Sequence, residues 1–162
     1  MSKKTEYILT CAVDVENLGA WPVLFLRRGR AMKALTVCQP FAHLIATGRK
    51  PIENRHWHTG YRGPLAIHAG KSRVWLQVCD NGRYPGMAFG AVVAIANLVG
   101  CVRIGELAEH YPDLAGHPHA EGPWCWILAD VERLNPPCPA RGRQGLWEWT
   151  RPCECRGDGA SA

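Results

Sequence analysis

Acidic residues are scarce in one long part of the sequence. Between Arg27 and Arg73 there are ten lysines and arginines, and Glu53 is the single acidic residue. This segment therefore carries +9, and because the whole chain carries +5, the rest of it carries −4. Such segregation produces a positive field over part of the surface, which favours a polyanionic partner such as nucleic acid. The alternative is a basic surface that is only solvated.

The sequence also lacks a long apolar run. The longest, at 87–102, has 16 residues and contains Asn97 and two glycines, whereas a membrane-spanning helix needs about 20 apolar residues. Acidic side chains interrupt the short apolar stretch near the start, unlike the apolar centre of a signal peptide. We therefore expect no membrane partner and a cytoplasmic location.

Zinc-binding spacing is absent as well. The chain has eight cysteines, but no two have the C-x2-C spacing of ordinary structural zinc sites. The other candidate zinc ligands are His117, His119, Cys138, Cys153 and Cys155, and their spacing matches no such site. We predict no metal and no cofactor.

The length indicates one domain. A chain of 162 residues and 17.9 kDa is close to the usual size of a single domain with its own core. Residues 1–31 are predicted to be a peripheral extension because their apolar runs are broken by Asn17, Gly19 and Pro22. We assign residues 32–150 to the domain, which we expect to be a monomer, and residues 151–162 to a disordered tail.

Apolar periodicity predicts several strands and a few short helices. The predicted strands are 34–38, 52–57, 65–69, 89–102, 124–134 and 145–149, and the predicted helices are 40–48, 72–78 and 105–111. Pro40 suits the first position of a helix, and Gly48 suits its left-handed C-terminal cap. Together with glycine bends at Gly90 and Gly100, this pattern predicts an α+β fold, a small mixed β-barrel with short flanking α-helices.

The stretch GRKPIENRHWHTGYRGP, from Gly48 to Pro64, has more cations than its one carboxylate can neutralise. Glu53 alone cannot balance Lys50, Arg55 and Arg62, so we expect cationic groups to remain for a ligand. The alternatives are that Arg55 only pairs with Glu53 on the same strand face and that Lys50 only offsets a helix dipole.

Two further arginines, Arg141 and Arg143, lie in a loop before the last predicted strand. A guanidinium group can donate two parallel hydrogen bonds to phosphate. We therefore predict that both contact a nucleic-acid backbone.

Aromatic residues supply the second ingredient of a nucleic-acid site, because base stacking contributes about 1–3 kcal/mol per base. Trp57 and Tyr61 are the predicted stacking platform. The pairs Trp124/Trp126 and Trp147/Trp149 are predicted to pack in the core or at the rim of the barrel instead.

Five segments, taken in order, resemble the ASCH domain (activating signal cointegrator homology) of the PUA-like superfamily. They are ALTVCQPFAHLIATGRKPIENR, YRGPLAIHAGKSR, GAVVAIANLVGCVRI, GPWCWIL and PARGRQGLWEW. Gly48, Lys50, Glu53 and Arg55 match the family motif G-x-K-x-x-E-x-R. The resemblance implies a compact PUA-like barrel with a helix-lined cleft and recognition of RNA or other nucleic acids.

The same resemblance also implies two alternative classes of function, an enzyme and a protein-interaction adaptor. Some ASCH-like proteins hydrolyse acetylcytidine with a Lys and a Thr; Lys50 matches the Lys, but Glu53 occupies the Thr position, so the nucleophilic hydroxyl is missing. Lys50 and Glu53 then remain as a catalytic couple for proton transfer. Other ASCH-like proteins are metal-dependent ribonucleases. The family name suggests the other alternative, a protein-interaction adaptor using the loop 112–123 and the tryptophans.

Overall fold

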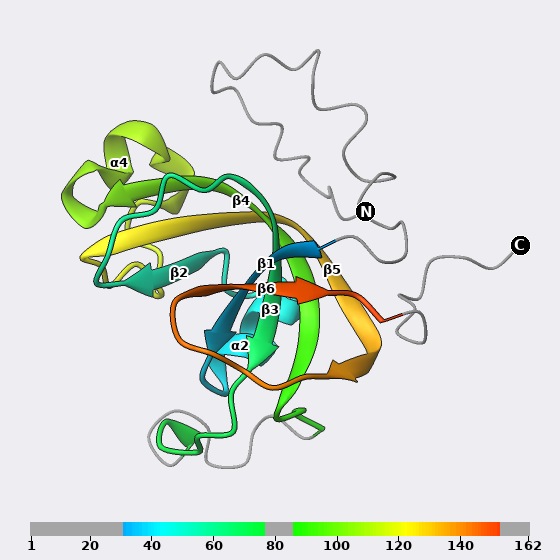
Figure 1. The fold of residues 1–162 in the computed structure, drawn as a ribbon. Coiled ribbons are helices and arrows are strands. Elements are labelled where there is room, and N and C mark those ends of the chain that lie inside the picture. The colour runs from blue at the N-terminus through cyan, green and yellow to red at the C-terminus, as the bar shows by residue number, and fades with distance from the viewer. Residues whose placement is uncertain (1–30, 77–85, 153–162) are drawn as a thin grey trace, which may run out of the picture.

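The computed structural model describes residues 31–76 and 86–152 (Figure 1). Apart from Ala31, the predicted extension lies outside the described residues. So do the predicted tail beyond its first two residues and the last two residues of the predicted helix 72–78.

The described elements are six strands and a few short helices. They are β1 (Ala31–Val37), α2 (Phe41–Ala46), β2 (Ile52–Arg55), β3 (Gly63–Ala69), β4 (Ala91–Arg103), α4 (Leu107–His110), β5 (Trp124–Pro139) and β6 (Leu146–Thr150). Short 3-10 turns at Ile104–Glu106 and Pro112–Leu114 flank α4. The α+β class predicted from periodicity is therefore confirmed.

Local sequence signals explain where α2 begins and ends. Pro40 is its N-cap residue, and Gly48 follows its last turn with a φ of +71°, a left-handed conformation that suits glycine. The helix packs its buried face, which includes Ala42 and Ile45, against β3, β4 and β5. In the part of the chain that the structure describes, no helix combines the length and apolarity needed to cross a membrane.

The strands form one mixed sheet in the order β2-β5-β4-β3-β1-β6. The β1 and β3 strands are parallel, and the other neighbouring strands are antiparallel. Three register shifts interrupt the pairing of β4 with β5, and such irregularities bend a strand and increase its twist. The long predicted strand at 89–102 is thus a bent one.

The sheet is curled but has two edges, β2 and β6. No backbone ladder joins these two strands among the described residues, so the predicted barrel is not closed by strand pairing. A side chain crosses the gap instead: Arg55 at the end of β2 donates through Nη2 to the carbonyl of Thr36 in β1, 2.8 Å away. Three strands separate β2 from β1 in the sheet order, so this contact requires the sheet to curl back on itself (Figure 1).

Apolar side chains fill both faces of the curled sheet. The concave face, covered by α2, holds a cluster that includes Leu35, Val37 and Trp126. The other face holds a second cluster with Met32, Trp147 and Trp149. These three tryptophans are buried as predicted, and Trp126 is completely buried.

Candidate nucleic-acid interface

Lys50 and Glu53 form a buried ion pair. Their side chains are 3% and 8% exposed, and Lys50 Nζ lies 2.9 Å from Glu53 Oε2. The ammonium group also donates to the carbonyl of Ile52. The cation of Lys50 is therefore satisfied inside the protein, where burying a charge requires such partners.

Glu53 also binds the next cation of the motif, Arg55. Its Oε1 lies 3.1 Å from Arg55 Nη2, so one carboxylate holds the ammonium of Lys50 and the guanidinium of Arg55. The side chain of Arg55 remains 24% exposed. Its Nε is buried without a hydrogen-bond partner among the described residues, and a buried donor of this kind is rare unless a water or ligand satisfies it.

The loop between β5 and β6 is fixed on the same residue that Arg55 reaches. Thr36 Oγ1 donates to the carbonyl of Arg143 across 2.9 Å and accepts from Trp147 Nε1 at 3.3 Å. Both Arg141 and Arg143 are exposed. The structure therefore brings Arg55 and the Arg143 backbone together at Thr36. Arg55 binds the carbonyl of this threonine, and the Arg143 carbonyl binds its hydroxyl.

A row of side chains crosses three strands beside Arg55. Trp124 is paired in register with Arg55 of β2 and with Arg103 of β4, so the three side chains project from one face of the sheet. The Arg103 guanidinium lies 4.7 Å from the Trp124 ring centroid, and the His58 ring lies 4.8 Å from it. We refer to Arg55, Arg103, Trp124 and the loop 140–145 as the mouth of the curled sheet.

Trp57 lies next to this row and is 37% exposed. Its ring meets the buried Trp126 edge to face, with centroids 4.6 Å apart. Its carbonyl accepts a hydrogen bond from Trp126 Nε1 at 3.3 Å. The buried tryptophan thus holds an exposed one in place.

Tyr61 and Arg62 have contacts within their own loop. The Tyr61 hydroxyl donates to the carbonyl of Pro64, and the ring packs against the concave core cluster. Burial, and secondarily the charge of Glu148, raises the pKa of Tyr61 above its usual value. Arg62 is exposed and donates to the carbonyls of Thr59 and Tyr61 at 3.0 and 2.8 Å. No described contact joins it to Thr36.

His68 contacts the loop 140–145, which carries Arg141 and Arg143. Its ring is 2% exposed, and its Nε2 lies 3.0 Å from the carbonyl of Ala140. The other nitrogen, Nδ1, has no partner among the described residues. Burial is the main cause that lowers the pKa of His68, and the charge of Lys71 adds to it, while the bond to Ala140 opposes both.

The loop 112–123 is pinned to β2 by Asn54. The Asn54 amide donates to the carbonyl of His119 at 2.9 Å and accepts from the backbone N–H groups of Glu121 and Gly122. The His119 ring consequently lies edge-on to Phe41, with centroids 6.4 Å apart. Burial, followed by the charge of Lys50, lowers the pKa of His119.

Sequence reasoning did not predict a place for Thr36, His58, Arg103 or Trp124 in a nucleic-acid site. A signal for two of them was present, because Arg103 follows the long apolar strand and Trp124 begins the next one. Antiparallel pairing of those strands places the end of the first beside the start of the second. The contacts of Thr36 and His58 depend on the curl of the sheet, which periodicity does not specify.

Comparison with protein families gives one domain match. The family model of the ASCH domain matches residues 35–138. The chain is 24% identical to human activating signal cointegrator 1 and 25% identical to the mouse protein, in each case over 130 residues. The matched part is 70% of this chain but 22% of those proteins, so the chain spans less than a quarter of the length of these relatives.

A similar solved structure is the crystal structure of ASCH from Zymomonas mobilis. It is 17% identical to this chain and superposes with a TM-score of 0.48, covering 74% of this chain and 87% of the other.

Proposed function

The chain belongs to the ASCH domain family, and from that premise we propose that it is a nucleic-acid-binding module that holds RNA at the mouth of its curled sheet. The observation that carries this proposal is the state of Arg55. Its Nη2 is engaged by Glu53 and Thr36, while its buried Nε has no partner among the described residues. The side chain is nevertheless 24% exposed, so a phosphate oxygen or a base acceptor can meet the exposed part of its guanidinium group.

The cations around Arg55 suit a phosphate backbone. Arg141 and Arg143 are exposed on the loop fixed to Thr36, and Arg103 lies on the other side of Trp124. Glu53 is already shared by Lys50 and Arg55. Glu106, three residues after Arg103, accepts from the Arg103 backbone N–H. The arginines of the mouth thus outnumber the carboxylates beside them.

Trp57 suits a base of a single strand. Its exposed ring is held at one edge by Trp126, and stacking on such a ring requires a base that is not already stacked in a duplex. Tyr61, the other predicted platform residue, is packed and hydrogen-bonded. We assign it a supporting role in the loop 56–62.

Lys50 acts indirectly in this proposal. With 3% exposure it contacts no ligand on the surface. Its positive charge offsets the negative charge of Glu53. Glu53 can therefore orient Arg55 without cancelling the positive field of the mouth.

Hydrolysis of RNA or of a modified nucleoside is the second candidate. One observation favours it: the Lys50 ammonium lies 5.7 Å from the Phe41 ring centroid and His119 lies 6.4 Å from it, so ionisable groups of two segments meet at one aromatic ring. Both wild-type and Lys50→Ala proteins should be assayed on RNA and on acetylated cytidine. Equal, negligible turnover by the two would eliminate this candidate.

RNA binding is tested by titrating a fluorescent single-stranded RNA at several salt concentrations. We expect affinity to fall with salt, with a log–log slope of about −0.7 for each phosphate contacted. The double variant Arg141→Gln/Arg143→Gln should reduce that slope by about 1.4 if each arginine contacts one phosphate. Lys33→Gln/Arg49→Gln, which removes two cations that are not among the mouth residues, is the matched control. Absence of binding at low salt, or an equal effect of both double variants, would contradict the proposal.

A further inference from the structure

A short turn after β3, at 71–76, exposes a second tryptophan ring. Trp75 is 46% exposed, more than Trp57 at 37%, and its neighbour Val74 is 70% exposed. Tryptophan is mostly buried in folded domains, as three other tryptophans of this domain are. A tryptophan ring left this exposed offers a face on which another planar group can stack.

The Trp75 ring is held at one edge, as the Trp57 ring is. It meets Phe41, the first residue of α2, with ring centroids 6.1 Å apart and ring planes inclined by 61°. Within the turn, the backbone N–H of Leu76 donates to the carbonyl of Arg73 at 3.1 Å. The ring is thus positioned before any ligand arrives, which reduces the entropy lost on binding.

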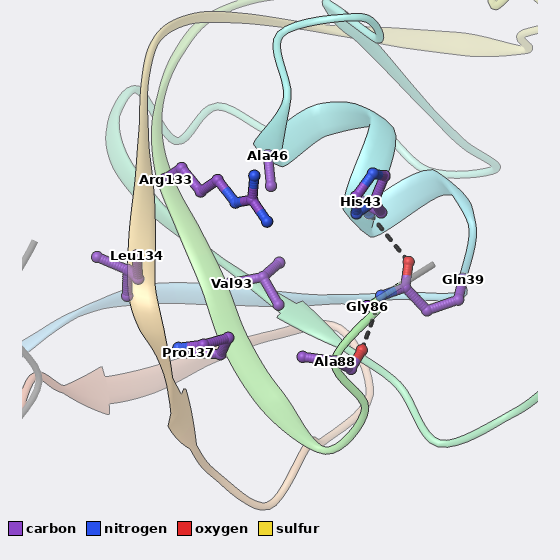
Figure 2. Close-up of a pocket in the computed structure, with 9 residues that line it drawn as sticks. All are labelled: Gln39, His43, Ala46, Gly86, Ala88, Val93, Arg133, Leu134 and Pro137. Atoms are coloured by element: carbon purple, nitrogen blue, oxygen red, sulfur yellow. Dashed lines mark hydrogen bonds between the residues drawn. The ribbon is translucent and has the colours of Figure 1, made fainter. Parts of the chain in front are cut away.

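The completely buried Gln39 fixes the two segments that support this turn. One support is α2, and the other is the segment before β4, where the Arg73 guanidinium lies 4.4 Å from the Phe89 ring centroid. Gln39 Nε2 donates to the carbonyl of Ala88 at 2.7 Å, and its Oε1 accepts from the backbone N–H of His43 at 2.9 Å (Figure 2). These two bonds tie the start of α2 to the segment before β4, so both aromatic supports of the turn keep fixed positions.

The turn adjoins the mouth at two points. Gly70, which precedes the turn, packs against Thr36, since a Cβ atom on this glycine would lie 3.3 Å from Thr36 Cγ2. The stem of Lys71 packs on Gly90, where a Cβ atom would lie 2.7 Å from Lys71 Cε. The carbonyl of Gly90 in turn accepts from the N–H of Ala140, in the loop of the mouth, at 3.0 Å. A strand bound at the mouth therefore lies within reach of the turn.

We propose that the turn 71–76 is a second contact surface for the RNA strand that the mouth holds, with Trp75 stacking on a base. Lys71 and Arg73 are exposed, and the described residues at 70–76 and 86–90 include no acidic residue, so these two cations suit phosphates of the same strand. Cations beside an exposed aromatic ring are the combination that single-strand-binding proteins use. The proposal rests on the proposed function and extends it to one strand that stacks on both Trp57 and Trp75.

The test is a titration of the full chain with fluorescent single-stranded RNAs of about 4 to 16 nucleotides, the range of site sizes in single-strand-binding folds. We expect wild-type affinity to rise with length until the RNA reaches both tryptophans. Trp75→Ala should weaken binding of the long RNAs about 5- to 150-fold, the contribution of one stacked base, and have little effect on the shortest. Trp75→Phe, which keeps an aromatic ring, should retain most of the affinity. Val74→Ala, which removes exposed apolar surface from the same turn, should bind like the wild type.

A salt titration with the long RNAs tests the two cations of the turn. Lys71→Gln/Arg73→Gln should reduce the log–log slope by about 1.4 if each side chain contacts one phosphate. Trp75→Ala should leave the slope unchanged, and the control Lys33→Gln/Arg49→Gln should reduce it less than the double variant of the turn does.

The outcomes separate this proposal from RNA binding at the mouth. If the wild type binds no RNA at low salt, the proposed function fails and this proposal fails with it. If Trp57→Ala weakens RNA binding while Trp75→Ala binds RNA of every length like the wild type, only this proposal is overturned, and the exposed ring of Trp75 is left for a protein partner. Urea unfolding checks that each variant is folded.

Discussion

Gly142 lies so close to His68 that a Cβ atom at position 142 would come within 2.5 Å of His68 Cε1. The same atom would also lie 2.9 Å from Thr36 Oγ1. His68 is buried and bonded to Ala140, and Thr36 is bonded to Arg143. Neither the His68 nor the Thr36 side chain can move away without breaking a hydrogen bond that fixes the loop 140–145.

Gly142→Ala should therefore displace the loop that carries Arg141 and Arg143. We expect a loss of about 1–3 kcal/mol in the free energy of unfolding, as for other overpacked sites, and weaker binding of single-stranded RNA. Urea unfolding and RNA titration measure the two effects. Gly105→Ala is the matched control, since a Cβ there meets no atom within 4 Å. Equal stability and RNA affinity in the two variants would show that the loop tolerates the methyl group.

The fold could be predicted from the sequence wherever a local signal decided it. Pro40 and Gly48 bound a helix because their backbone preferences act within one turn, and the apolar run before Arg103 gave a long strand. The predicted strand ending at Leu134 continues to Pro139, because pairing with the start of β4 overrides the prolines in that segment. A barrel was expected from the strand pattern with its glycine bends and from the family resemblance, but the described sheet retains two edges.

The candidate site could be predicted only in part, for a related reason. The pairing of Glu53 with Arg55 follows from their positions on one face of a strand, and the structure contains that pair, although Arg55 also donates to Thr36. The burial of Lys50 does not follow from a motif rich in cations, because it depends on Phe41, Ile52 and Glu53 enclosing one ammonium group. The contact of Arg143 with Thr36 joins residues 107 positions apart, a distance over which periodicity carries no information.

Removing the buried ammonium should cost stability. In Lys50→Met the carboxylate of Glu53 stays buried and keeps Arg55 as its ionic partner. We expect the free energy of unfolding to fall by about 3 kcal/mol, near the lower end of the range for breaking a buried ion pair. The double variant Lys50→Met/Glu53→Gln should recover part of that loss, because no buried carboxylate then remains. Urea unfolding measures both, and a double variant no more stable than Lys50→Met would contradict this account.

Acidification should destabilise the domain through His68. Its pKa is lowered in the folded state, chiefly by burial, so the unfolded chain takes up a proton at a higher pH than the folded chain does. The stability present above the ordinary histidine pKa of about 6.5 should decrease as the pH falls through that value toward the folded pKa. His119 acts in the same direction.

The variant His68→Gln separates these two histidines. Glutamine keeps an N–H donor for the carbonyl of Ala140 but does not titrate, so the loss of stability between about pH 7 and pH 5 should be smaller than in the wild type. Urea unfolding at several pH values provides the measurement. An unchanged pH dependence would assign the effect to His119 or to other groups.

The exposed tryptophan provides the sharpest test of how a nucleic acid would be held. Trp57→Ala should weaken binding of single-stranded RNA by about 1–3 kcal/mol, the contribution of one stacked base, with little change in the salt slope because no phosphate contact is lost. Tyr61→Phe, which removes the hydroxyl bonded to Pro64, should lower the free energy of unfolding by about 1 kcal/mol and leave RNA affinity unchanged. A fluorescence titration that follows quenching of Trp57 by the bases should lose that component of the signal in Trp57→Ala. If Tyr61→Phe weakens RNA binding as much as Trp57→Ala does, the base stacks elsewhere in the loop and the assignment of Trp57 is wrong.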